Sequence, residues 1–188
     1  MTVTTGIAHT GVIGVLHGSL PGPTVALRAE LDALPITENV DVPFASRVRA
    51  PYRGQDTGVM HACGHDVHVA ILMGTATVLA RQRARLRGTV VFIFQPDEEQ
   101  TAGPDEKGGA ALMLAEGLLE KTHPQALFAL HVTNQFAVGT VRLAPGAAKA
   151  GTDALEIVVT GRQVHAARPW GESIRSWPRR RSCSGCRP

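Results

Sequence analysis

The apolar run "VVFIF" at residues 90–94 constrains the fold more than any other part of the sequence. A strand with one face in water alternates apolar and polar side chains, and this run does not alternate. The sequence therefore predicts a strand at 88–96 that is covered on both faces. Further strands are predicted at 10–18, 24–31, 126–132, 139–145 and 153–161, and helices at 66–86 and 108–121.

The alternation of strands and helices predicts an α/β fold, a sheet with helices on both faces. A chain of 188 residues with 44% hydrophobic content can bury one sizeable core, or one core and the beginning of a second. The formal charge is only +3, and the basic clusters at 81–88 and 175–188 are not interleaved with aromatic residues, so no nucleic-acid partner is expected.

The sequence gives no sign of a membrane-associated or secreted protein. No apolar run approaches the roughly 18 residues that span a bilayer, so no membrane partner is expected. Residues 1–11 lack the basic start and apolar centre of a secretory signal. We therefore expect a cytoplasmic location, in which thiols stay reduced.

The stretch "HACGHDVH" at 61–68 has the residue types of a metal site. Cys63 and His65 are both ligands for zinc and neighbouring transition metals. Gly64 between them permits backbone angles that would let both side chains turn toward one ion.

Structural interpretations of the same stretch remain open. The histidines at 61, 65 and 68 could line one face of a helix, and Cys63 could be a small buried apolar residue. Asp66 is expected to be the N-cap of the following helix. This role is compatible with metal binding nearby.

Three other segments place polar residues where predicted strands end. Glu98 and Glu99 follow the buried strand, and adjacent carboxylates there are unfavourable unless a positive charge neutralises them. Taken alone, this segment is more often a solvated loop, which the stretch just downstream resembles. His131 ends an apolar strand, where a lone histidine is more often a structural residue than a ligand. Asp32 could be a turn residue or a carboxylate that orients a metal-bound imidazole. None of these signals decides the matter separately.

Five segments taken in order resemble the metal-dependent amidohydrolase family of N-acyl-amino-acid amidohydrolases, which includes hippurate hydrolases and indole-acetyl-amino-acid hydrolases and has aminoacylase relatives. They are "VALRAELDALPITE", "VMHACGHDVHVAILMGTA", "VFIFQPDEE", "ALHV" and "GRQVHAARPW". The resemblance implies a zinc-peptidase-like catalytic domain, followed by a small α/β lid domain that also mediates dimerisation.

The resemblance also implies roles for individual residues. Two divalent metal ions, Zn, Mn, Co or Ni, would be held by Cys63, His65, Glu99 and His131. Glu98 would be the general base, and His165 would bind substrate. Asp32 and Asp66 are expected to support the site. His61 and His68 are expected to have lesser supporting roles.

The implied function is hydrolysis of the amide bond of a small-molecule N-acyl amino acid by water activated at the two metal ions. A homodimer is expected for the intact family. The alternative is an inactive, truncated fragment that retains partial metal binding, because the family pattern includes helices before the first strand and a C-terminal half with a further ligating histidine.

The expected organisation has three parts. Residues 1–146 would be an incomplete catalytic metal-binding domain, 147–172 the beginning of the lid domain, and 173–188 an out-of-frame tail. The tail hypothesis arises because "ESIRSWPRRRSCSGCRP" departs from the family pattern and can be back-translated into a shifted frame that reads "VDPVVAASAVLLGLQ". Resequencing the gene tests it, and coding DNA without that alternative frame would rule it out.

Overall fold

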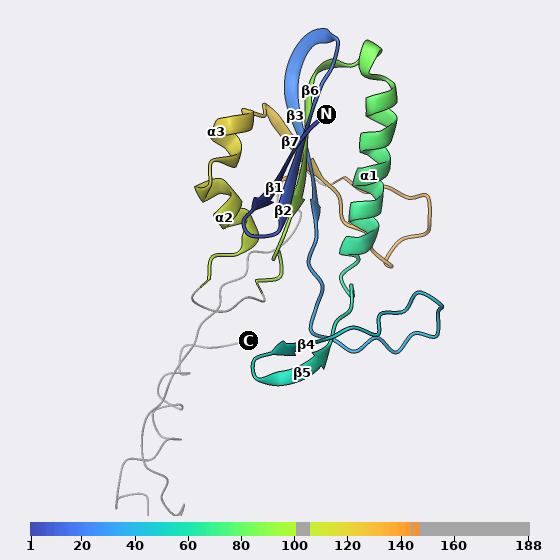
Figure 1. Ribbon diagram of the computed structural model, residues 1–188. Helices are drawn as coiled ribbons and strands as arrows, with labels where there is room; N and C mark the ends of the chain where they lie inside the picture. The colour runs from blue at the N-terminus through green and yellow to red at the C-terminus, as the bar shows by residue number, and fades with distance from the viewer. Residues whose placement is uncertain (101–105, 144, 147–188) are drawn as a thin grey trace, which may run out of the picture. The chain divides into compact units, whose positions relative to one another are not determined.

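The strand predicted from "VVFIF" is β6 (Arg87–Gln95), which lies in the middle of a five-stranded sheet (Figure 1). The computed structural model describes residues 1–100, 106–143 and 145–146. The sheet order is β1 (Thr2–Ile7), β2 (Gly11–His17), β6, β3 (Leu20–Glu30) and β7 (Ala126–Ala129).

The pairing of these strands aligns four of them in one direction, and only β2 runs the opposite way. β2 is antiparallel to both β1 and β6, whereas β3 is parallel to its neighbours β6 and β7. The carboxyl ends of β3, β6 and β7 therefore lie at the same edge of the sheet. In open α/β sheets this edge is where ligands usually bind.

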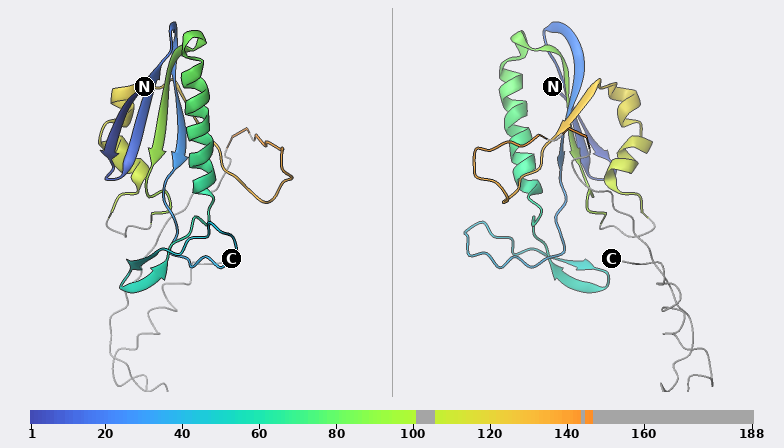
Figure 2. Two further views of the ribbon diagram at one scale, coloured as in Figure 1. Left: turned by 45° about the vertical axis from the view of Figure 1, so that its right-hand side comes forward. Right: turned by 180° about the vertical axis from the view of Figure 1, so that it is seen from behind.

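Helices cover both faces of the sheet, as Figure 2 shows. α1 (His65–Arg81) lies on one face, and α2 (Gly109–Ala115) and α3 (Leu118–Thr122) lie on the other. The chain passes from β3 to β6 through α1, and from β6 to β7 through α2 and α3. The predicted α/β class with helices on both faces is confirmed.

Two apolar clusters show why β6 carries an unbroken apolar run. Successive side chains of β6 point to opposite faces, so each face receives alternate residues. The cluster under α1 consists of Leu16, Ala29, Leu72, Val90 and Phe92. The cluster under α2 and α3 consists of Ile7, Ala8, Ile13, Ala26, Val91, Ile93, Met113 and Leu118.

Several elements differ from the prediction. The strand expected at 139–145 is wrong, since the described residues there form no strand. The single helix expected at 108–121 is two helices, because Gly117 adopts a left-handed conformation with φ of 87° between them. β1 and a hairpin of β4 (Arg49–Tyr52) and β5 (Gln55–Gly58) were not predicted.

The helix expected at 66–86 begins one residue earlier, at His65, and its α-helical part ends at Arg81. A short 3-10 helix, η1 (Arg83–Arg85), follows it. All of these elements belong to one compact unit, Met1–Val138.

Within the described ranges, the chain has no helix with the length and apolar character needed to cross a membrane. The strand expected at 153–161, the beginning of the lid at 147–172 and the tail at 173–188 lie outside the described residues. The three-part organisation therefore stays a prediction.

Candidate metal centre

Polar residues from four segments converge at the carboxyl edge of the parallel strands. Asp32 follows β3, Glu98 and Glu99 follow β6, and His131 follows β7. His65 is the first residue of α1. Parallel pairing brings these segments together although they are far apart in the sequence.

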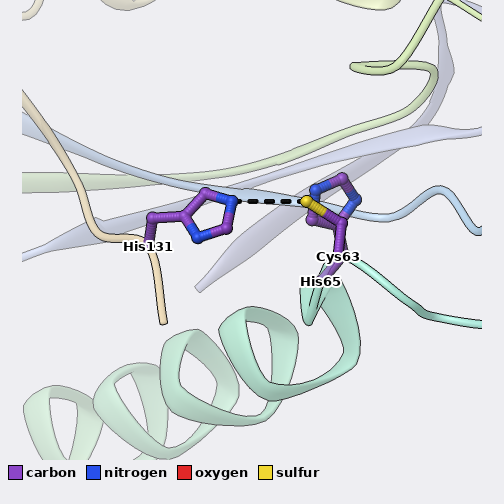
Figure 3. A group of neighbouring side chains, drawn as sticks. All are labelled: Cys63, His65 and His131. Atoms are coloured by element: carbon purple, nitrogen blue, oxygen red, sulfur yellow. Dashed lines mark hydrogen bonds between the residues drawn. The ribbon is translucent and has the colours of Figure 1, made fainter. Parts of the chain in front are cut away.

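Cys63 and His131 face each other across this edge (Figure 3). The Sγ atom of Cys63 lies 3.4 Å from Nε2 of His131, within hydrogen-bonding distance for sulfur. Nδ1 of His131 lies 2.7 Å from the backbone oxygen of Val132, which can only accept a hydrogen bond. Nδ1 therefore carries the proton, and the lone pair of Nε2 is directed toward the thiol.

His65 is almost completely buried, at 1% exposed, and one side of its ring is fixed by Asp32. Its Nδ1 donates to Asp32, with the backbone oxygen at 3.0 Å and Oδ1 at 3.1 Å. Its Nε2 therefore has a lone pair, yet this buried atom has no hydrogen-bond partner among the described residues. Leaving such an acceptor unsatisfied costs about 1–3 kcal/mol, and a bound cation would remove that cost.

Asp32 also orients the glutamate segment. Its Oδ2 accepts a hydrogen bond of 3.0 Å from the backbone N–H of Glu99. Oε2 of Glu98 lies 3.9 Å from Nε2 of His65, and the Glu98 side chain is 40% exposed. One carboxylate thus holds an imidazole and positions the acidic segment beside it, the arrangement expected of a residue that supports metal ligands.

The potential ligand atoms form two trios that share His65. One contains Cys63, His65 and His131, the other His65, Glu98 and Glu99, and the atoms within each trio lie within 4.8 Å of one another. Sulfur, nitrogen and carboxylate oxygen together suit zinc and its transition-metal neighbours. The residues present therefore fit a metal centre.

A third trio, Glu30, His65 and His68, is also close enough to hold an ion. However, His68 has no lone pair available. Its Nδ1 lies 2.7 Å from Oε2 of Glu30, and its Nε2 accepts a hydrogen bond of 3.0 Å from the N–H of Val132. This trio is therefore a hydrogen-bonded support for the neighbouring site.

The environment of Glu30 keeps it ionised. Burial acts to raise the pKa of this carboxyl, but the hydrogen bond with His68 and the charge of Arg28 outweigh it, so the pKa lies below its ordinary value. The Arg28 guanidinium lies 2.7 Å from Glu30 Oε1.

Of two other predicted site residues, one has a different role from the expected one and one lies outside the described residues. Asp66 is not the N-cap of α1, because Gly64 occupies that position in a left-handed conformation, and no side chain of the described residues caps the helix. Asp66 is exposed and lies in the first turn of α1. Its negative charge there interacts favourably with the positive end of the helix dipole. His165 lies outside the described residues.

Sequence reasoning missed the contacts of His68 with Glu30 and Val132. The spacing of His65 and His68, three residues apart, signals a shared helix face. It does not reveal partners contributed by β3 and by the segment after β7.

Comparisons with known proteins identify relatives that share a large part of this sequence. N-acetylcysteine deacetylase of Bacillus subtilis is 44% identical over 160 residues, which cover 85% of this chain and 38% of the relative. IAA-amino acid hydrolase ILR1-like 2 of Arabidopsis thaliana is 42% identical over 163 residues, covering 87% of this chain and 33% of the relative. The chain thus spans well under half the length of these relatives.

Solved structures show the same fold. The YXEP protein of Bacillus subtilis, described as a dinuclear metal binding peptidase from the M20 family, matches with a TM-score of 0.61 and 42% identity, over 73% of this chain and 35% of that one. A putative aminohydrolase from methicillin resistant Staphylococcus aureus matches with a TM-score of 0.58 and 37% identity, over 70% of this chain and 30% of that one.

The sequence pattern of the family described as Peptidase family M20/M25/M40 matches residues 26–177. That range contains every residue of the two ligand trios. The chain belongs to peptidase family M20/M25/M40.

Proposed function

We propose that this chain is part of a metal-dependent hydrolase that cleaves the amide bond of N-acyl amino acids. The observation that carries the proposal is the buried Nε2 of His65, which has no hydrogen-bond partner in the described part of the chain and is surrounded by sulfur, imidazole and carboxylate groups. The relatives named for N-acetylcysteine and IAA-amino acids support this substrate class.

Cys63, His65, Glu99 and His131 would hold two divalent cations. When bound, such ions lower the pKa of water and polarise a substrate carbonyl. The name of the YXEP protein supports a dinuclear site. The mixed donor set is compatible with Zn, Mn, Co or Ni.

Glu98 is the proposed general base. Its carboxylate is the most exposed of the acidic groups in the ligand trios, so it can contact both water and substrate. It would take a proton from the attacking water and pass it to the nitrogen of the leaving amine. Asp32 would keep the Nδ1–H form of His65 and hold the backbone of Glu99.

The test is hydrolysis by the 188-residue chain loaded with Mn, Zn or Co. Release of amino acid from N-acetyl, benzoyl and indole-acetyl conjugates is measured for the wild type and for Glu98→Gln. We expect Glu98→Gln to lose about 10²–10⁴-fold in rate while its metal content stays unchanged, because general-base catalysis contributes on that order.

Glu120→Gln is the matched control. Glu120 is an exposed glutamate on α3, and its substitution is expected to leave the rate unchanged. Turnover in the wild type that does not exceed that of Glu98→Gln would contradict the enzymatic proposal for this chain.

A second candidate function is metal binding without turnover. It is favoured by the coverage, since the chain spans only 38% of N-acetylcysteine deacetylase. A cobalt titration separates the two candidates. Binding that is lost in Cys63→Ser, without any measurable amide hydrolysis, would support the non-catalytic alternative.

A further inference from the structure

A chain of hydrogen bonds runs behind the ligand residues, starting at the end of β6. Nε of Arg28 donates to Oε1 of Gln95 at 2.6 Å. Nη1 of Arg28 donates to Oε1 of Glu30 at 2.7 Å. Glu30 and Gln95 are both 3% exposed, so water does not compete strongly for these bonds.

The series of hydrogen bonds continues from Glu30 to His68. Its Nδ1 donates to Oε2 of Glu30 at 2.7 Å, which leaves a lone pair on Nε2. That lone pair accepts the backbone N–H of Val132 at 3.0 Å. His68 is 2% exposed, and the Glu30 carboxylate fixes which of its nitrogens carries the proton.

Val132 links His68 to His131. Its N–H is held by His68, and its backbone oxygen accepts the hydrogen bond from Nδ1 of His131 at 2.7 Å. The rings of His68 and His131 also touch edge to face, with centroids 4.7 Å apart and an interplanar angle of 74°. The orientation of His131 therefore depends on His68 through both the backbone and ring packing.

We infer that His68, held by Glu30, is a positioning residue that fixes Val132 and thereby directs Nε2 of His131 toward Cys63. The expected effect of His68 on metal affinity rests on the proposed function, because it requires that His131 be a metal ligand. The hydrogen bonds themselves are formed by residues of this chain, so their role can also be measured without added metal. His131 is exposed, and so the segment after β7 needs such an anchor to hold a ligand in place.

Two measurements test the inference without relying on turnover. Amide hydrogen exchange of the metal-free chain reports whether the peptide containing Val132 is ordered. Cobalt titration, followed by the thiolate-to-cobalt absorption band of Cys63, reports affinity. For His68→Leu we expect faster exchange in that peptide and about 10–100-fold weaker cobalt binding, the usual effect of losing a residue that supports a ligand.

Two amide variants separate positioning from simple packing. Glutamine can place its side-chain oxygen near the former Nε2 position and accept the Val132 N–H. Asparagine reaches only the Nδ1 position and can contact Glu30 alone. We therefore expect His68→Gln to retain most of the cobalt affinity and His68→Asn to lose it. This comparison shows whether His68 acts by accepting the Val132 N–H, even if His68→Leu does not fold.

His17→Leu is the control, because His17 is an exposed histidine on β2, away from the site. It should match the wild type in both measurements. Equal cobalt affinity and equal exchange in His68→Gln and His68→Asn would overturn the inference. Absence of cobalt binding in the wild type would refute the proposed function, while the metal-free exchange comparison would still decide the role of His68.

Discussion

At the scale of single residues, Asp32 connects two ligand-bearing segments. Its carboxylate accepts hydrogen bonds from Nδ1 of His65 and from the backbone N–H of Glu99. In Asp32→Asn one of these donors must face an amide NH₂ group. We expect zinc or cobalt affinity to fall about 10–100-fold, as measured by competition with a chromophoric chelator.

Asp56→Asn is the matched control for this substitution. Asp56 forms an exposed ion pair with Arg49 in the β4–β5 hairpin, and exposed pairs contribute about 0–1 kcal/mol. Its metal affinity should equal that of the wild type. If Asp32→Asn binds metal as tightly as Asp56→Asn, then Asp32 does not orient the ligands.

Glu30 gives a pH prediction at the same scale. Its folded-state pKa lies below the ordinary value of 4.5, so the folded chain favours the ionised carboxylate. The resulting stabilisation is present above pH 4.5 and is lost as the pH falls toward the lower, folded-state pKa. Acid unfolding of the metal-free chain, followed by circular dichroism, should therefore be less steep in this pH range for Glu30→Gln. Identical pH profiles would contradict the prediction.

At the scale of elements, one glycine at the N-cap of α1 and one inside the helix should respond in opposite ways to the same substitution. Gly64 has φ of +87°, and an added Cβ would lie 2.5 Å from Cγ2 of Val132. The left-handed conformation alone costs alanine roughly 1–2 kcal/mol. Gly74 lies within the helix, and no atom of the described residues lies near an added Cβ, so alanine should stabilise the helix by about 0.5–1 kcal/mol.

Thermal unfolding measures both effects, with a lower Tm expected for Gly64→Ala and a higher one for Gly74→Ala. Gly64→Ala should also weaken cobalt binding, because the clash moves Val132 beside His131. Equal unfolding temperatures for the two variants would show that the start of α1 tolerates an ordinary side chain.

The elements also show which features a sequence reveals. The buried strand β6 was predictable because both of its faces require apolar residues, and its position at the centre of the sheet follows. β1 was missed because five of its six residues are exposed, so its place depends on pairing with β2. The wrong strand at 139–145 has a β-like sequence but lacks a partner strand among the described residues.

In the candidate site, too, features encoded locally were predictable and features that depend on long-range contacts were not. Residues placed just after predicted strands, such as Asp32, Glu98 and His131, could be expected to meet because parallel strands share an edge. The contact between His68 and Glu30 joins residues on α1 and β3, and no local pattern encodes it. Long-range hydrogen-bond partners are determined by tertiary packing. The sequence therefore indicated the candidate ligands but not the hydrogen bond between His68 and Glu30.

At the scale of the whole molecule, β7 is an edge of the sheet described here and all four of its residues are exposed. Leu127 is 49% and Phe128 59% exposed, an apolar edge of the kind that pairs with another chain. We expect the 188-residue chain to self-associate through this strand as its concentration rises. Phe128→Lys should reduce the association, because a charged side chain at an edge opposes further pairing.

Sedimentation velocity over a range of concentrations measures this effect, with Phe44→Lys as the control. Phe44 is more exposed, at 84%, but it lies in a loop outside the sheet, so its substitution removes apolar surface without changing an edge strand. If both lysine variants reduce association equally, general surface hydrophobicity is the cause. A reduction confined to Phe128→Lys would identify strand pairing at β7, the strand that leads to His131, as the cause of association.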